Sequence, residues 1–270
     1  MIMRYLIFLF VTLCIVSCHN NYNPDEIDDD ISYLNCEQVY DNGNYFANCE
    51  EMIDTVGLKL YHFVQFTDEE WRSLPNNIKL ERRQIPEDFL RGMTTKELFY
   101  QIVFTDVCGD MFLVDKVDKR YNMVTELLNR PDASHVLLEL LRKYVPQIEV
   151  IGDCFHWCYL FELFISQPEI INSMTDEDIC TYIHHLLRCH EILRTKCQNS
   201  ADQPCYTAYM LFIWYGLGNV MIRYEFEPFM QIVPRRQSTN EIAWSPSRQV
   251  SEDFILRIID YVEQFINKKP

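Results

Sequence analysis

Three short motifs that cap helices restrict this chain to a largely helical fold. Thr67–Glu70, Thr94–Glu97 and Thr175–Asp178 each place a hydroxyl residue three positions before a carboxylate. In such a motif each side chain accepts a hydrogen bond from the backbone N–H of the other residue. Apolar residues at helical spacing follow each motif, so each one predicts the start of a helix.

Apolar residues recur at helical spacing in several other stretches. We expect helices at residues 86–93, 119–129, 136–144 and 155–166, and a last helix after Ser251. Short turns rich in proline, asparagine and aspartate separate them. The sequence therefore predicts an all-α fold, either an irregular multi-helix bundle or a solenoid-like helical stack, although no exact repeat period emerges.

The part of the chain before these helices is less regular. Residues 58–66 are rich in aromatic and apolar side chains, which fit either an extended segment or a loop held against the helical body. We expect a single helical domain over residues 31–270, in which residues 31–75 are irregular and residues 76–270 form the helical core.

Residues 206–222 are the most apolar stretch after the N-terminus. They are slightly short for a membrane span, and Gly216, Gly218 and Asn219 interrupt them. We therefore expect a buried helix around which the others pack, with a transmembrane helix as the alternative. The two glycines would let another backbone approach closely.

The first eighteen residues have the features of an export signal. Arg4 precedes an unbroken apolar run at residues 5–16, which is too short to cross a bilayer but fits a secretory signal. Ser17 and Cys18 resemble a bacterial lipobox, in which the cysteine thiol is acylated and becomes the mature N-terminus. We expect residues 1–17 to be a signal peptide and Cys18 to carry covalent lipid such as palmitate. An ordinary signal peptide and an uncleaved anchor are the alternatives.

Residues 18–30 are polar and acidic, and they lack apolar periodicity. We expect them to form a lipidated, flexible tether. Their carboxylates could bind calcium, but the glycine and the spaced ligands of an EF-hand loop are missing. A solvated run of charge is therefore the favoured interpretation.

The formal net charge of −16 limits the partners of this chain. A surface this acidic repels nucleic acids and anionic headgroups, so we expect no nucleic-acid partner. Attachment to a membrane must then come from the N-terminal lipid. A protein and a small-molecule ligand are the partner classes that remain open.

Nine of the eleven cysteines lie after Cys18. An exported protein meets oxidising conditions, so we expect some of these to pair, and an odd number leaves at least one outside any intramolecular pair. Cys197 and Cys205 flank a polar turn and are the first candidate pair. Cys36 and Cys49 are the second.

Cysteines and histidines in the second half of the chain form the densest set of potential metal ligands. The set comprises Cys154, His156, Cys158, Cys180, His184, His185, Cys189 and His190. On a helix, Cys154 and Cys158 would share one face. Cys180 and His184 would do the same, so two facing helices could offer four zinc ligands. The favoured interpretation is cysteines on apolar faces with histidines at the surface, so we expect no metal cofactor.

No catalytic signature is present in the sequence. It lacks the His-Glu-x-x-His zinc motif, the Gly-x-Ser-x-Gly elbow, a phosphate loop and the Gly-x-Gly-x-x-Gly fingerprint. A cysteine nucleophile paired with His156 or His184 would need a lowered thiol pKa, which an acidic protein disfavours. We therefore expect no catalytic residues.

Residues 70–173 resemble a known family. The residues that carry the resemblance are Glu70-Trp71, Gln84-Ile85-Pro86-Glu87, Met93 to Leu98, Glu126 to Ala133, Leu163 and Gln167 to Ile170. They are similar to a family of secreted or lipid-anchored helical proteins of gut bacteria, chiefly Bacteroidetes. Residues 206–229 match it more loosely. The family has no assigned activity, so the resemblance implies a helical fold and an exported protein, and it transfers no active site.

These features predict a lipoprotein of the bacterial cell envelope, anchored at the outer membrane, that works by binding rather than by catalysis. The alternatives are a hydrolase with a scattered active site and a zinc-binding helical protein. A pocket in which a cysteine, a histidine and a carboxylate converge would favour the hydrolase. An exposed apolar or aromatic surface would favour the binding module.

Overall fold

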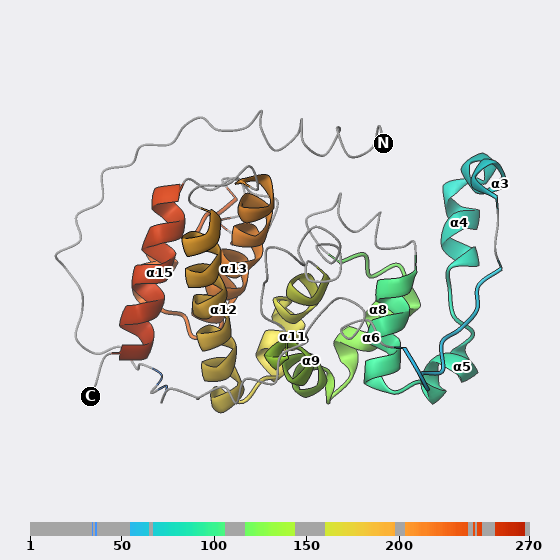
Figure 1. Cartoon of the computed structure of the whole chain (residues 1–270), viewed down its shortest axis with the longest axis horizontal. Helices are drawn as coiled ribbons and strands as arrows, with labels where there is room; N and C mark the ends of the chain where they lie inside the picture. The colour runs from blue at the N-terminus through green and yellow to red at the C-terminus, as the bar shows by residue number, and fades with distance from the viewer. Residues whose placement is uncertain are drawn as a thin grey trace. The chain divides into compact units, whose positions relative to one another are not determined.

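A computed structural model describes residues 34, 36, 55–64, 67–105, 117–143, 160–197, 203–236, 240, 242–244 and 252–267 (Figure 1). The regular elements in these ranges are helices, which confirms the all-α prediction. They are α3 (Asp68–Ser73), α4 (Asn76–Arg82), α5 (Glu87–Gly92), α6 (Thr95–Phe104), α8 (Asn122–Asn129), α9 (Ala133–Arg142), α11 (Pro168–Ser173), α12 (Asp176–Cys197), α13 (Gln203–Arg223), α14 (Glu227–Ile232) and α15 (Glu252–Asn267). A further helical stretch covers residues 160–165.

The chain divides into two compact units. The middle unit is Asp41–Asp178, and the terminal unit is Met1–Tyr40 together with Ile179–Pro270. Helix α12 therefore begins at the end of the middle unit and continues in the terminal unit. One folding domain over residues 31–270 stays a prediction, because two compact units can unfold together or separately.

All three capping motifs begin a helix. At α6 the Thr94 hydroxyl accepts a hydrogen bond from the Glu97 N–H at 3.2 Å, and the Glu97 carboxylate accepts one from the Thr94 N–H at 2.7 Å. Thr67–Glu70 form the same box at α3, and Thr175–Asp178 form it at α12. These bonds satisfy N–H groups that the start of a helix leaves without intrahelical partners, which is why the sequence predicts these starts well.

Other helix ends differ from expectation. α5 begins after Pro86, which is its N-cap and not its first residue. α8 begins at Asn122, three residues later than expected, because the Asp118 side chain accepts a hydrogen bond from the Arg120 N–H and stabilises a turn there. α14 was not expected, since six residues are too few to show an apolar period.

In the middle unit, α6, α8, α9 and α11 pack around one apolar core. Phe99 of α6 is fully buried, and its ring centroid lies 4.4 Å from that of Phe161 and 6.1 Å from that of Phe164. Val124 of α8 and Leu137 of α9 are also fully buried. Burial of this kind contributes about 1.5–3 kcal/mol for each large apolar side chain, so the core holds α6 firmly in place.

In the terminal unit, α13, α14 and α15 pack on one another, and a loop brings Trp244 into their core. An isolated antiparallel bridge between Arg235 and Ile242 closes this loop. The Trp244 Nε1–H donates to the Tyr215 carbonyl at 3.1 Å, and its ring centroid lies 4.5 Å from that of Trp214. The loop therefore supplies a core side chain to a helical unit.

Helix α13 covers residues 206–222, where a buried helix is expected, and the structure describes the burial of its second half. All of its residues from Ile213 to Met221 are buried. None of the helices that the structure describes is long and apolar enough to cross a membrane. A Cβ placed on Gly216 would meet the Tyr182 hydroxyl, and one on Gly218 would meet the Trp244 ring. A backbone was expected to approach these glycines closely. In the structure, side chains approach them instead.

One local arrangement occurs twice along the chain. α5 with α6, and α11 with α12, each consist of a six-residue helix beginning at or just after a proline, a buried methionine, a threonine cap and a longer helix. The methionines are Met93 and Met174. The two copies share only these few positions, which explains why no exact repeat period is visible in the sequence. The first turns of α6 and α12 can therefore be compared position by position.

Replacing Thr94 with alanine should lower the free energy of unfolding by about 1 kcal/mol, because it removes the hydroxyl of the capping box. Urea unfolding followed by circular dichroism measures this change. The control is Thr94→Ser, which keeps the hydroxyl and should remain close to the wild type. Equal stability of the alanine and serine variants would show that the box does not stabilise the helix.

Candidate interaction site

Residues 58–64 of the middle unit pass beside α6 (Figure 1). Two side chains of that helix hold their backbone there. The Lys59 N–H donates to Glu97 Oε1 at 2.8 Å, and the Tyr61 N–H donates to Gln101 Oε1 at 2.5 Å. Both acceptor residues are buried. Residues 58–64 belong to no helix or strand and are named the edge segment below. Two N–H groups two residues apart bond to one helix, which fits both expectations for residues 58–66, an extended segment and a loop held against the helical body.

The register of these two bonds follows from the dimensions of the two elements. Glu97 and Gln101 are four residues apart, which is about 6 Å along an α-helix. Lys59 and Tyr61 are two residues apart, which is about 6.6 Å along an extended chain. Because the spacings nearly agree, one face of α6 can accept hydrogen bonds from every second N–H of an extended segment. The bonds go to the backbone, so they do not depend on the side chains of the segment.

Glu97 connects the cap of α6 to the edge segment. Its Oε2 accepts hydrogen bonds from the N–H and the hydroxyl of Thr94, while its Oε1 accepts the bond from Lys59. Burial raises the pKa of this carboxyl, but hydrogen bonds from Lys59 and Thr94, with the Lys59 charge, outweigh burial and hold the pKa below its ordinary value. Glu97 is therefore an ionised acceptor at neutral pH.

The Gln101 amide is oriented by Thr105, one turn further along the chain. Gln101 Nε2 donates to Thr105 Oγ1 at 3.3 Å, and the Thr105 hydroxyl donates to the Gln101 carbonyl at 2.6 Å. With its nitrogen directed to Thr105, the amide presents its oxygen to the Tyr61 N–H. The Gln101 side chain, the second acceptor on α6, is thus held in place by a residue of its own helix or its C-cap.

Ring contacts hold the C-terminal end of the edge segment. The Arg83 guanidinium lies 5.4 Å from the ring centroid of Phe63 and 4.4 Å from that of Trp71. Arg83 is nearly buried, and a cation between two aromatic faces is stabilised by both rings. These contacts tie the edge segment to the α3–α4 region as well as to α6.

Apolar side chains remain exposed around the edge segment. The ring of Phe89, on α5, packs edge-on against that of Tyr61 at 5.3 Å and is still 38% exposed. Val64 is 65% exposed, and Val56, just before the edge segment, is 90% exposed. The segment is therefore firmly attached on one side and bordered by accessible apolar surface.

Sequence reasoning missed Glu97 and Gln101 as residues of a site. Glu97 was interpreted only as half of a capping box, and Gln101 was given no role. The available signal was a pair of polar residues four apart within an otherwise apolar helix, because buried polar groups require hydrogen-bond partners. The distant partner, a backbone segment some forty residues earlier, leaves no such signal.

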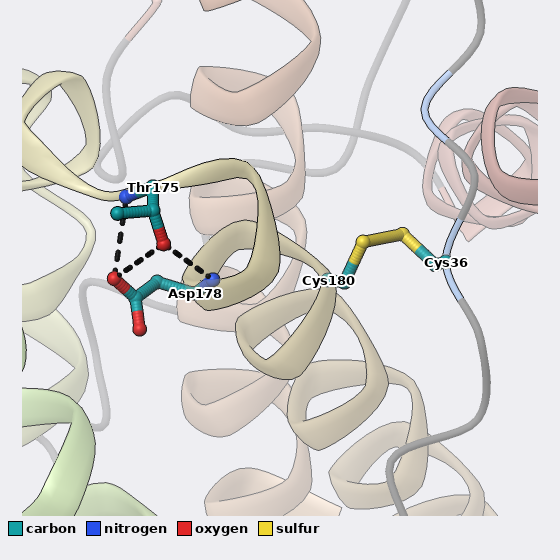
Figure 2. Close-up of a disulfide and its surroundings, with 4 residues drawn as sticks. All are labelled: Cys36, Thr175, Asp178 and Cys180. Atoms are coloured by element: carbon teal, nitrogen blue, oxygen red, sulfur yellow. Dashed lines mark hydrogen bonds between the residues drawn. A yellow bond between two sulfur atoms is a disulfide. The ribbon is translucent and has the colours of Figure 1, made fainter.

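The first turns of α12 hold another segment by a covalent bond. A disulfide joins Cys36 to Cys180, with their Cα atoms 5.2 Å apart (Figure 2). Figure 2 also shows the cap, in which the Asp178 carboxylate accepts hydrogen bonds from the N–H and the hydroxyl of Thr175. Cys180 follows the cap carboxylate by two residues, as Phe99 does in α6. Helix α6 therefore holds residues 58–64 by hydrogen bonds, whereas α12 holds Cys36 by a disulfide.

This disulfide overturns one candidate cysteine pair and one of the alternatives for metal binding. Cys36 pairs with Cys180, so the expected pair of Cys36 with Cys49 is wrong, because sequence spacing does not show which thiols the fold brings together. Cys180 has no thiolate to offer a metal, so the four-ligand zinc set that combined it with His184 is wrong as well.

The other candidate residues stay predictions. Cys18, Cys49, Cys154 and Cys158 lie outside the described residues. Cys197 is the last residue of α12 and Cys205 is the third residue of α13, but the structure describes neither side chain. The pairing of Cys197 with Cys205 is therefore untested.

Three histidines and Cys189 follow Cys180 along α12, before its last residue, Cys197. His184 Nε2 is buried, and no described residue forms a hydrogen bond with it. The Cys189 Sγ lies 3.3 Å from His185 Nε2, but Cys189 is only 2% exposed. A nucleophile must be reached by its substrate, so the burial of this thiol disfavours a catalytic role, although His185 is only half-buried.

Lowering the pH from 7.5 to 5.5 should destabilise the terminal unit through His184 and His190. Burial lowers the pKa of both imidazoles, and Arg194 lowers that of His190 further, against the opposing charge of Glu191. Unfolded imidazoles keep a pKa of about 6.5, so the unfolded state takes up protons first. The stability is therefore complete above that pH and is lost as the pH falls toward the folded pKa values.

Urea unfolding at the two pH values measures this loss. The double variant His184→Gln/His190→Gln removes both imidazoles and should show a smaller difference between the two pH values. A difference as large as that of the wild type would assign the pH dependence to other groups.

Comparisons with known proteins give no relative of this chain. No family model, no curated protein and no solved structure matches it. The resemblance of residues 70–173 to helical proteins of gut bacteria therefore stays a prediction.

Proposed function

We propose that this chain is a lipoprotein of the bacterial cell envelope, at the outer membrane, that works by binding another molecule and not by catalysis. The observation that carries the proposal is the disulfide between Cys36 and Cys180. Disulfides form and persist in exported proteins and are rare in the cytosol. The disulfide therefore supports export by the N-terminal leader.

The membrane attachment is covalent lipid on Cys18. The apolar run at residues 5–16 delivers this cysteine to the export machinery, and residues 18–30 form the tether. A chain with a net charge of −16 gains no attraction from anionic headgroups, so lipid is the attachment consistent with its charge.

The binding role is supported by the surface around the edge segment. Val56, Val64 and Phe89 expose apolar area within the middle unit, beside a segment that α6 holds in a defined position. Exposed apolar surface on a well-ordered element is typical of sites for partners. The Cys189 thiol on α12 is by contrast buried, which disfavours a role as a nucleophile.

The test of the anchor is Cys18→Ser in the full chain, expressed in a bacterium that processes lipoproteins. The wild type should incorporate labelled palmitate and partition into the detergent phase, and the variant should do neither. Cys14→Ser changes a neighbouring cysteine of the leader and is the matched control, which should behave like the wild type. Labelling and partitioning of the Cys18 variant at wild-type levels would refute the proposal.

A further inference from the structure

The edge segment has a second edge that α6 does not use. In an extended chain successive N–H groups point to opposite sides, so the N–H groups of Leu60 and His62 face away from the acceptors on α6. No described residue accepts a hydrogen bond from either N–H. His62 is exposed and Leu60 is partly exposed, so this edge is accessible.

A row of accessible N–H and C=O groups is a template for another strand. Residues 58–64 are already ordered before a partner binds. Glu97 and Gln101 hold their other edge, and Arg83 packs against Phe63. A segment that is already ordered loses little conformational entropy when a partner pairs with it. Backbone pairing of this kind is a known mode of peptide recognition.

We propose that the accessible edge of residues 58–64 binds an extended polypeptide segment of another protein, which adds to it as a second strand. This inference rests on the proposed binding function and names the partner class. Hydrogen bonds to Leu60 and His62 would provide the register. Val64 and Phe89 would contact apolar side chains of the added strand.

The charge of the edge segment indicates which kind of polypeptide would bind to it. Residues 58–64 include Lys59 and His62, both exposed, and no acidic residue, although the whole chain carries a net charge of −16. Two copies paired through this edge would bring two Lys59 charges together with no carboxylate of the segment between them. An added strand that carries carboxylates between apolar residues complements the edge, and a second copy does not.

The test uses the purified full chain and a panel of capped peptides of about ten residues, in which valine alternates with glutamate or threonine. Fluorescence anisotropy measures their binding. The decisive variants are His62→Pro and His62→Ala. Proline removes the N–H but fits an edge strand, whereas alanine removes the side chain and keeps the N–H.

The wild type and His62→Ala should bind the peptides with dissociation constants within about threefold of each other. His62→Pro should bind about tenfold more weakly, and so should the wild type with peptides methylated at every backbone nitrogen. Circular dichroism and thermal unfolding of His62→Pro should match those of His62→Ala, which shows that the fold is kept.

Three results would overturn the proposal. They are the absence of binding by the wild type across the panel, equal affinity of His62→Pro and His62→Ala, and a wild-type dimer in analytical ultracentrifugation that His62→Pro dissociates. The last result would assign the edge to a second copy. None of these results bears on detergent partitioning of the Cys18→Ser variant, so failure of the anchor and failure of strand addition are separate outcomes.

Discussion

Reducing the Cys36–Cys180 disulfide is expected to lower the free energy of unfolding by about 2–5 kcal/mol. The bond joins residues 144 positions apart, so it closes a long loop and restricts the unfolded chain strongly. The chain-entropy relation gives about 5 kcal/mol for a loop of this length, which is the upper end of the range. Urea unfolding with and without reductant measures the loss, and thiol titration confirms that the bond has opened.

Two variants separate this effect from a general effect of the reductant. Cys36→Ser should already have the stability of the reduced wild type and should not respond further. Cys189→Ser keeps the disulfide and should respond to reductant as the wild type does. A wild type that releases the thiols of Cys36 and Cys180 without losing stability would contradict the prediction.

Gly218→Ala is expected to destabilise the terminal unit by about 3 kcal/mol. A Cβ at Gly218 would lie 2.1 Å, 2.4 Å and 2.7 Å from three atoms of the Trp244 ring. The ring cannot move aside easily, because its Nε1–H is bonded to the Tyr215 carbonyl and it makes edge-to-face contacts with the rings of Trp214 and Phe229. Either the ring or the helix must shift, and the core loses contacts.

The matched control is Gly92→Ala at the end of α5. A Cβ there would meet nothing within 4 Å, so only the helix propensity changes, and the variant should be unchanged or up to about 1 kcal/mol more stable. Urea unfolding of both variants gives the comparison. Equal stabilities of the two alanine variants would show that Trp244 has room to relax.

Local signals predicted the helices of this chain well. The boxes at Thr67, Thr94 and Thr175 begin α3, α6 and α12, because the residues that form each cap are three positions apart and need no tertiary partner. The apolar stretch around Trp214 became the buried helix α13 for a similar reason, since its composition leaves no polar face. α14 escaped prediction because a single short turn carries little periodicity.

Contacts between distant residues were not predictable in the same way. The partner of Cys36 is decided by which cysteine of the folded chain lies at bonding distance, and nearby spacing favoured Cys49 instead. The two N–H groups held by Glu97 and Gln101 belong to backbone, which has no residue type to recognise in a sequence. The candidate site therefore depends on tertiary structure, although each of its elements was recognisable alone.

The disulfide would also affect how a pulling force passes from a bound partner to the proposed lipid anchor at Cys18. Cys36 comes eighteen residues after Cys18, and the edge segment lies inside the covalent loop between Cys36 and Cys180. A partner pulling on residues 58–64 would load two covalent arms of that loop, which rejoin at the disulfide before the tether. Without the bond, residues 37–57 alone would transmit the tension to the anchor. Under the proposed anchor at Cys18 and the proposed strand addition, the disulfide would divide the load of a bound partner between two covalent paths.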